Sequence, residues 1–264
     1  DPAPPHRITM IGLRPDEPAG PPPERLSAAG FAAAVRQHLD GLAAKDRFSG
    51  AVSVTRNGRE MIRGAWGMAD REKKIPNRPD TKFNLGSMNK MFTAVAIAQL
   101  AQAGKLRFDD PVGRHLKDYP NRDVAEKVTI HHLLTHTGGT GDIFGPEFDR
   151  NIAKLRDLKD YVALYGARAP AFPPGSRWAY SNYGYILLGR IIEEVSGMSY
   201  YSYVREKIFQ PAGMKDTASF WKTEEVENLA RGYDTGPDGS HKCNDETLPM
   251  RGTSAGGGYS TVDD

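Results

Sequence analysis

The sequence contains one cysteine, Cys243, among 264 residues, so no disulfide can form within the chain. It has no run of about 18 apolar residues, the length that an apolar helix needs to cross a bilayer, and we therefore expect no membrane span. It also lacks an excess of one charge, because 35 Lys and Arg face 33 Asp and Glu. The resulting net charge of +2 gives no reason to expect nucleic acid as a partner.

The start of the chain has neither a methionine nor the apolar core of a signal peptide, and this predicts a processed or excised N-terminus. Residues 1–24 are rich in proline around one β-like run, residues 8–11, and we interpret them as an extended arm or linker. Residues 25–264 remain for one domain. The whole sequence has 39% hydrophobic and 26% charged residues, which is ordinary for a soluble globular protein.

Local patterns predict a first helix with Ser27 as its N-cap, followed by a β-hairpin. The two strands are expected at residues 50–55 and 61–66, and Asn57-Gly58 is the turn pair between them. Residues 87–235 are predicted to be mainly helical. The helices expected there include 87–103 closed by Gly104, 128–135, 155–166, 183–196 closed by Gly197, and 203–209 stopped by Pro211. This order predicts an α+β fold, an antiparallel sheet flanked by helices plus a helical region.

Ser87 and Lys90 stand three residues apart at the start of the strongest helical segment, on one face of its first turn. A serine hydroxyl is a weak nucleophile until a neighbouring base accepts its proton. A buried lysine with a lowered pKa can accept or relay that proton, and the Ser87 N–H is a candidate oxyanion donor. The alternative is that Ser87 is an ordinary N-cap and Lys90 an ordinary helical lysine, because this spacing alone is common.

Tyr180-Ser181-Asn182, about ninety residues later, strengthens the first interpretation. Tyr180 and Asn182 alternate on an extended turn, so both side chains can project to the same side. A tyrosine beside a protonated lysine can act as general base and later protonate the leaving group, and Asn182 can bridge the lysine and a substrate amide. Alternatively, Asn182 caps the following helix and Tyr180 is a half-buried aromatic.

Four segments in this order resemble the class C β-lactamase-like serine hydrolases, which include D-alanyl-D-alanine carboxypeptidases, D-aminopeptidases and carboxylesterases. The resemblance covers roughly residues 27–264. The segments are Phe83–Lys90, Leu133–Gly139, Pro174-Gly175 with Tyr180–Asn182, and Gly256–Thr261.

The resemblance implies a β-lactamase/transpeptidase-like fold with Ser87 as acylated nucleophile, Lys90 as its activating partner and Tyr180 as proton shuttle. It implies Asn182 as a hydrogen-bond donor to substrate. The expected activity is hydrolysis of an amide or ester, whether a β-lactam, a D-amino-acid peptide or a carboxylic ester, without metal or cofactor. Family habit also implies a periplasmic or secreted protein, with a small molecule or peptide as its partner.

The family's third motif has no match after Asn182. Lys222-Thr223-Glu224 lacks the glycine, and His136-Thr137-Gly138 precedes Tyr180. We therefore expect the C-terminal strands to be absent from this chain and to be supplied by a C-terminal fragment of the same protein. A catalytically silent protein of this fold that binds peptidoglycan or a related ligand is the alternative function.

Two further signals do not indicate cofactors. His132 and His136 are spaced as metal ligands on a helix would be, but the Glu of a zincin motif is missing, and we interpret their loop as structural. The run Gly256–Gly258 is not followed by the Lys of a phosphate loop. It predicts instead a close approach of backbone near the active site.

Overall fold

The N-terminal part is one helix packed on a β-hairpin. The computed structural model describes residues 26–264, so the expected proline-rich arm and its strand lie outside the described residues. Helix α1 (Ala28–Ala43) begins after Ser27, whose hydroxyl accepts the N–H of Gly30 at 3.1 Å. This confirms the predicted cap.

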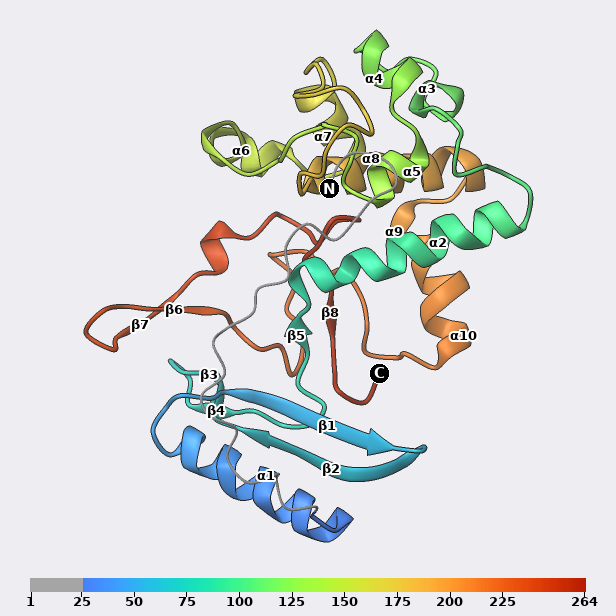
Figure 1. Ribbon diagram of the computed structural model, residues 1–264. Helices are drawn as coiled ribbons and strands as arrows, with labels where there is room; N and C mark the ends of the chain where they lie inside the picture. Colours follow the sequence, from blue (N-terminus) through green and yellow to red (C-terminus); the bar gives the residue numbers. More distant parts are fainter. Residues whose placement is uncertain (1–25) are drawn as a thin grey trace, which may run out of the picture.

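Strands β1 (Gly50–Arg56) and β2 (Arg59–Trp66) pair antiparallel, and α1 lies against β2 (Figure 1). Asn57 and Gly58 have positive φ angles of 51° and 72°, which confirms the predicted turn.

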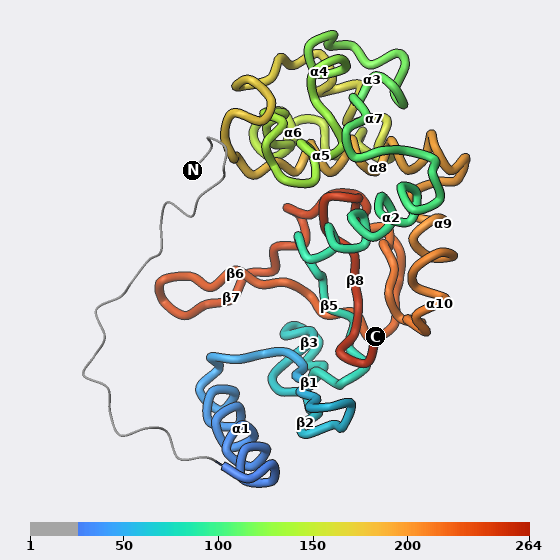
Figure 2. The backbone as a smooth tube through the Cα atoms, turned by 45° about the vertical axis from the view of Figure 1, so that its right-hand side comes forward, coloured from blue at the N-terminus to red at the C-terminus, as the bar shows by residue number. Residues whose placement is uncertain are grey.

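The remaining strands are short and lie between this hairpin and the helices (Figure 2). Within residues 26–264 the strands form four separate two-stranded antiparallel sheets, so the α+β class is confirmed but no continuous sheet is present there. This agrees with the expectation that central strands of the family's sheet are not among these residues. The short pairs are β3 (Met68–Asp70) with β4 (Ile75–Pro76), β5 (Phe83–Asn84) with β8 (Tyr259–Ser260), and β6 (Tyr233–Thr235) with β7 (His241–Cys243).

The helical region gathers at the opposite end from α1 (Figure 1). The last α-helix among residues 26–264 ends at Ala212, earlier than the expected limit near residue 235. None of the helices among residues 26–264 is long and apolar enough to cross a membrane. The helices are α2 (Lys90–Gln102) after the 3₁₀ turn η1 (Gly86–Asn89), α3 (Val112–His115), α4 (Arg122–Lys127), α5 (Ile130–Leu134), α6 (Pro146–Asn151) with η2 (Ile152–Lys154), α7 (Leu158–Tyr165), α8 (Asn182–Ser196), α9 (Tyr200–Val204) with the π-turn η3 (Arg205–Phe209), α10 (Gln210–Ala212) and η4 (Asp245–Thr247).

Helix α8 is the centre of the core, and α2, α5 and α7 pack around it. Its stripe of Leu187, Ile191 and neighbouring apolar side chains is fully buried, and each such side chain contributes about 1.5–3 kcal/mol to the free energy of unfolding. Gly189 permits a close approach of two neighbours, because a Cβ there would lie 2.3 Å from Ser254 Oγ and 2.6 Å from Leu158 Cδ1. Gly197, with φ of 71°, ends the helix as predicted.

The prediction that Pro211 stops a helix is wrong. The helical segment that begins at Tyr200 continues through Pro211 and ends at Gly213, whose φ is 75°. Because proline has no backbone N–H, Pro211 cannot donate a hydrogen bond to the carbonyl of Lys207, four residues earlier. That carbonyl instead accepts the side-chain amide of Gln99 at 3.0 Å, so the missing bond is replaced from α2.

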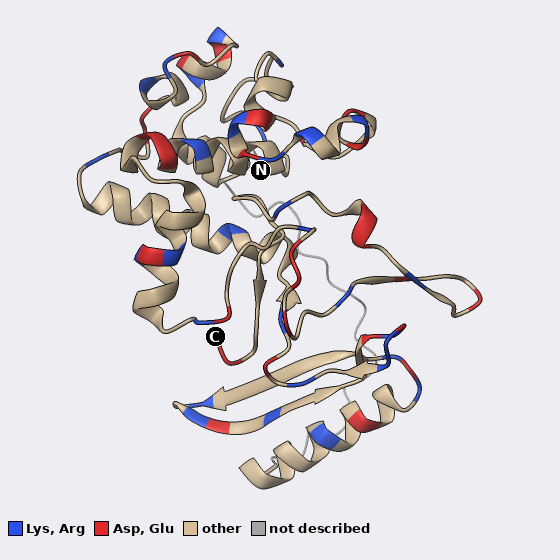
Figure 3. Ribbon diagram, turned by 180° about the vertical axis from the view of Figure 1, so that it is seen from behind, with Lys and Arg blue, Asp and Glu red and all other residues tan. Residues whose placement is uncertain are grey.

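Positively and negatively charged residues are interspersed over the described part of the chain (Figure 3). Helix α2 differs, because Lys90 is its only charged residue. It buries Phe92 and Ile97 but leaves Met91 and Val95 exposed. A helix that is apolar on nearly every side is typical of a position deep inside a protein.

Removing the cap of α8 tests how strongly this core helix depends on it. The Ser181 hydroxyl accepts the N–H of Gly184 at 2.9 Å and donates to the carbonyl of Gly141 at 2.5 Å. We expect Ser181→Ala to lower the free energy of unfolding by about 1–2 kcal/mol in urea denaturation. Ser27→Ala removes an exposed cap that makes one hydrogen bond, so it should lower the free energy of unfolding by less than Ser181→Ala does. An equal loss would contradict this ranking.

Candidate active site

Ser87 lies at a sharp change of direction between β5 and the helical turn η1. Gly86 has a positive φ of 50°, and its N–H donates to the Asn84 side chain at 2.8 Å. Its carbonyl accepts the N–H of Gly257 at 3.2 Å. These bonds hold the Ser87 side chain in an exposed position at the start of the segment that leads into α2.

Lys90 is buried below Ser87 and meets acceptors from three parts of the chain. Its Nζ lies 3.2 Å from Ser87 Oγ, 2.7 Å from Asn182 Oδ1 and 2.5 Å from the carbonyl oxygen of Ala255. The residue is only 7% exposed. The local spacing of Ser87 and Lys90 therefore corresponds to a real contact, so Lys90 is not an ordinary exposed helical lysine.

The surroundings of Lys90 act on its pKa in opposite directions. Burial lowers the pKa below that of an ordinary lysine, while the hydrogen-bonding and charge interactions with Tyr180, and the charge of Asp142, raise it. The ammonium also lies over two aromatic rings, with Nζ 4.8 Å from the centre of Tyr180 and 5.3 Å from that of Tyr185. Such faces stabilise a cation that has lost its water.

Tyr180 approaches Ser87 from the other side. Its hydroxyl donates to Ser87 Oγ at 2.7 Å, and the residue is 40% exposed. Asn182 is the first residue of α8 and donates from Nδ2 to Asp142 Oδ1 at 2.9 Å. The alternative in which Asn182 caps this helix is wrong, because the N-cap is Ser181.

The structure thus brings together all four predicted site residues. Reasoning from sequence missed Asp142 and the carbonyl of Ala255. Asp142 follows the Leu133–Gly139 segment closely, and Ala255 directly precedes the glycine run, so proximity to these motifs was the available signal.

His136 connects the Leu133–Gly139 segment to Tyr180. Its ring stacks against Tyr180 with centroids 4.5 Å apart, and its Nδ1 accepts the N–H of Ser181 at 3.1 Å. The backbone of His136 has a φ of 58°, a strained conformation for a residue with a side chain. Burial, and then the charge of Lys90, lower the pKa of His136. The neutral ring is therefore favoured, and only a neutral ring can accept that hydrogen bond.

The other histidine of the candidate metal pair belongs to a helix cap. His132 Nδ1 accepts the N–H of Thr129 at 3.3 Å, while the Thr129 hydroxyl accepts the N–H of His132. Within the described part of the chain, no group of three His, Cys, Asp or Glu side chains is placed to hold a metal ion.

The glycine run lies against the nucleophile segment, as predicted. A Cβ on Gly256 would lie 3.1 Å from the carbonyl oxygen of Gly86, and one on Gly258 would lie 2.4 Å from Asn89 Oδ1. Only glycines permit this approach, which brings the Ala255 carbonyl within reach of Lys90.

A cavity of about 240 Å³ opens beside Ser87. Its walls are largely apolar, with Ile143 and Phe144 on one side and Leu248 and Pro249 on another. Asn182 lies in its wall together with Ser87.

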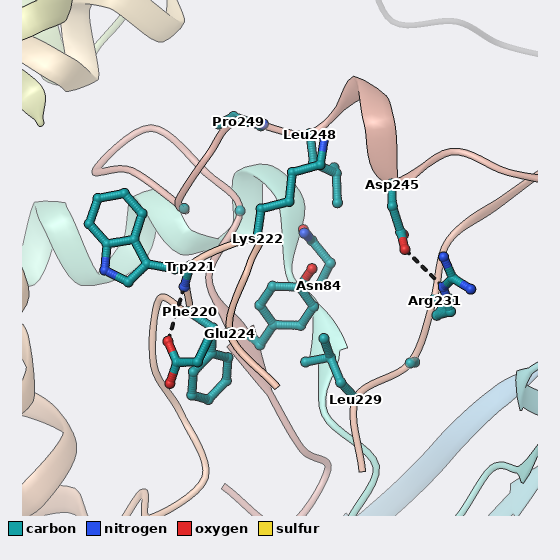
Figure 4. A pocket seen from close by; sticks show the side chains of 14 residues that line it. Asn84, Phe220, Trp221, Lys222, Glu224, Leu229, Arg231, Asp245, Leu248 and Pro249 are labelled. Atoms are coloured by element: carbon teal, nitrogen blue, oxygen red, sulfur yellow. Dashed lines mark hydrogen bonds and ion pairs between the residues drawn. The ribbon is translucent and has the colours of Figure 1, made fainter. Parts of the chain in front are cut away.

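A second cavity of about 290 Å³ shares Asn84, Leu248, Pro249 and Gly257 with the first (Figure 4). Its charged side chains mostly satisfy one another or nearby backbone: Arg231 bonds Asp245 at 2.9 Å, and Glu224 accepts the N–H of Trp221 at 3.2 Å. This second cavity therefore offers no excess charge to a ligand.

Comparison with known proteins shows the family to which this fold and this arrangement of serine, lysine and tyrosine belong. Residues 31–264 match the family model described as Beta-lactamase, and the chain belongs to that family. The expected fold and family resemblance are thereby confirmed.

Among its relatives, penicillin-binding protein 4* of Bacillus subtilis is 36% identical over 75% of this chain and 45% of its own length. Esterase EstB of Burkholderia gladioli is 38% identical over 80% of this chain and 57% of its own length. A penicillin-binding protein from Bacillus halodurans has a similar structure, with a TM-score of 0.76 and 39% identity over 86% of this chain and 71% of that one. The chain thus spans about half the length of the two curated relatives.

The lowered pKa of His136 predicts that acid weakens the fold. Since the folded chain binds this proton less readily than the unfolded chain, the free energy of unfolding should fall as the pH drops below the ordinary value of 6.5. The contribution of His136 to the free energy of unfolding is fully present above that pH. Denaturation between pH 7 and pH 5 should show a shallower decline in His136→Gln than in the parent. His38→Gln, which removes an exposed histidine of α1, should lose stability with falling pH as steeply as the parent does. An equally steep loss in His136→Gln would contradict the assignment of the acid sensitivity to His136.

Proposed function

We propose that this chain is a serine hydrolase that forms an acyl-enzyme at Ser87 and hydrolyses an ester or amide. One observation carries the proposal: Ser87 Oγ lies within hydrogen-bond distance of both Tyr180 Oη, at 2.7 Å, and Lys90 Nζ, at 3.2 Å. A serine held between a proton acceptor and a cation, at the wall of an apolar cavity, is suited to nucleophilic attack on a carbonyl.

In this proposal Tyr180, and not Lys90, receives the serine proton. Two of the three donor positions of Lys90 are directed at Asn182 Oδ1 and the Ala255 carbonyl, which can only accept. An ammonium satisfies both acceptors and places a positive charge beside the Tyr180 ring. The support is therefore for Lys90 as a fixed cation and Tyr180 as the general base.

The reaction then proceeds in two steps. Tyr180 first gives its hydroxyl proton to solvent, and Ser87 Oγ then attacks the carbonyl carbon as its own proton passes to the Tyr180 phenolate oxygen. The Ser87 N–H donates to the developing oxyanion. Tyr180 returns the proton to the departing alcohol or amine. Water next attacks the acyl-enzyme and gives a proton to Tyr180. Tyr180 passes this proton to Ser87 Oγ as the ester bond breaks, which releases the carboxylic acid and restores the Ser87 hydroxyl.

Replacing the nucleophile tests the proposal directly. Incubation with a p-nitrophenyl ester or a fluorescent penicillin should leave an acyl group that peptide mapping places on Ser87. Ser87→Ala should lose the adduct and at least about 10³-fold of kcat/KM. Ser240→Ala, a change at an exposed serine away from the cavity lining, should behave as the parent. An adduct on another residue, or unchanged turnover in Ser87→Ala, would show the proposal to be wrong.

Removing one hydroxyl tests the general base. Tyr180→Phe keeps the ring that stacks on His136 but removes the proton acceptor, and kcat should fall by about 10²–10⁴-fold. Tyr185→Phe is the matched control: its ring also faces Lys90, but its hydroxyl donates to the Leu134 carbonyl. Steady-state kinetics and thermal unfolding of both variants check this. Equal losses of kcat in two folded variants would exclude the role of Tyr180.

A further inference from the structure

His136 holds the backbone on both sides of Tyr180. Its Nδ1 accepts the N–H of Ser181 at 3.1 Å, and its backbone carbonyl accepts the N–H of Ala179 at 2.9 Å. Ala179 and Ser181 are the two neighbours of Tyr180 in the sequence. A single histidine from the loop after α5 therefore fixes the backbone from which the proposed base reaches Ser87.

The His136 ring is also packed among aromatic rings. Its centroid lies 4.5 Å from that of Tyr180, 5.2 Å from that of Tyr185 and 6.2 Å from that of Trp178. Lys90 Nζ lies 4.8 Å from the centre of the same Tyr180 ring. Tyr180 thus contacts both a histidine ring and an ammonium.

No negative charge is placed to stabilise a protonated His136. The titratable groups that face its ring are Tyr180, Tyr185 on α8 and, through its charge, Lys90 at the start of α2. Burial, and then the charge of Lys90, lower the pKa of His136. Among residues 26–264 the histidines that form an ion pair with a carboxylate lie elsewhere in the fold, and they are His115 and His241.

A proton on His136 would remove the hydrogen bond to Ser181. An imidazolium carries an N–H on both ring nitrogens, so its Nδ1 would then face the Ser181 N–H as one donor faces another. Ser181 is the N-cap of α8 and stands between Tyr180 and Asn182. Displacement of Ser181 therefore moves two residues of the proposed site, and the Tyr180 hydroxyl is the one bonded to Ser87 Oγ.

We propose that His136 is a positioning residue whose neutral ring holds Tyr180 against Ser87, so that one proton on His136 displaces the base and stops acylation. This inference rests on the proposed hydrolysis at Ser87 and adds a requirement to it. Two groups must be free of a proton for the reaction to begin: Tyr180, because it accepts the serine proton, and His136, because it holds Tyr180 in place.

The test is the pH dependence of kcat/KM for p-nitrophenyl acetate, which reports the ionisations of the free enzyme. Where Tyr180 alone must lose a proton, log kcat/KM falls by about one for each pH unit of acidification. Once His136 must lose a proton as well, the slope becomes about two. We expect the parent to show this steeper slope at low pH. Circular dichroism at each pH checks that the chain is still folded where the slope is measured.

His136→Asn is the matched variant. Asparagine offers a carbonyl oxygen in place of Nδ1, does not titrate, and tolerates the φ of 58° at this position better than most residues. Its slope should stay at about one over the whole range, so that its kcat/KM exceeds the parent's by a factor that grows about tenfold per pH unit. His131→Asn makes the same change at an exposed histidine of α5 and should keep the parent's slope of about two.

The parent alone supplies a second measurement, in case His136→Asn is inactive or unfolded. The ring resonances of His136 are followed by NMR over the same pH range, and the bend in the rate profile should fall at the pH where this ring titrates. A bend at another pH overturns the inference.

The remaining outcomes separate the inference from the proposed function. If Ser87 is acylated but the parent has the same slope as His136→Asn, His136 does not control Tyr180; the inference is overturned and the function stands. If p-nitrophenyl acetate leaves no acyl group on Ser87 at any pH, both the function and the inference fail.

Discussion

The buried ammonium of Lys90 is the constraint on which the site depends. A charge taken out of water is costly unless acceptors surround it, and here they come from the start of α2, the start of α8 and the loop before β8. Along the chain, Asn182 lies 92 residues from Lys90 and Ala255 lies 165 residues from it. Packing of the helices is therefore coupled to the chemistry, because a movement of α8 against α2 would separate the cation from its Asn182 acceptor.

The loop before β8 is fixed in register against α2. Three successive carbonyls meet three polar side chains: Thr253 accepts from Asn89 at 2.8 Å, Ser254 from Thr93 at 2.7 Å, and Ala255 from Lys90 at 2.5 Å. Displacing the loop by one residue would move all three carbonyls away from their donors. The glycines that follow permit the approach, and Asn89 and Thr93 fix the register.

Features that follow from local chemistry were predictable from the sequence. The Asn57-Gly58 turn and the glycines that end α2 and α8 depend on φ preferences of single residues, and they were found where expected. Pro211 does not stop the helix, because the side chain of Gln99 supplies the hydrogen bond that the proline cannot donate. Gln99 is distant in sequence, so no local pattern could predict this partner.

The same distinction applies to the site. Ser87, Lys90, Tyr180 and Asn182 lie in segments whose order along the chain resembles a known family, and the sequence therefore indicated them. No sequence pattern could indicate the Ala255 carbonyl as a site group, because every residue carries a backbone carbonyl. Asp142 became part of the site only through the orientation that Lys90 imposes on Asn182.

Tyr180 is half-exposed and lacks the burial that fixes Lys90. Its position therefore depends on the strained His136, whose ring packs against the Tyr180 ring and accepts the N–H of Ser181, the next residue. The site thus joins a cation fixed by burial to a phenol fixed by stacking, and the second is the easier of the two to displace.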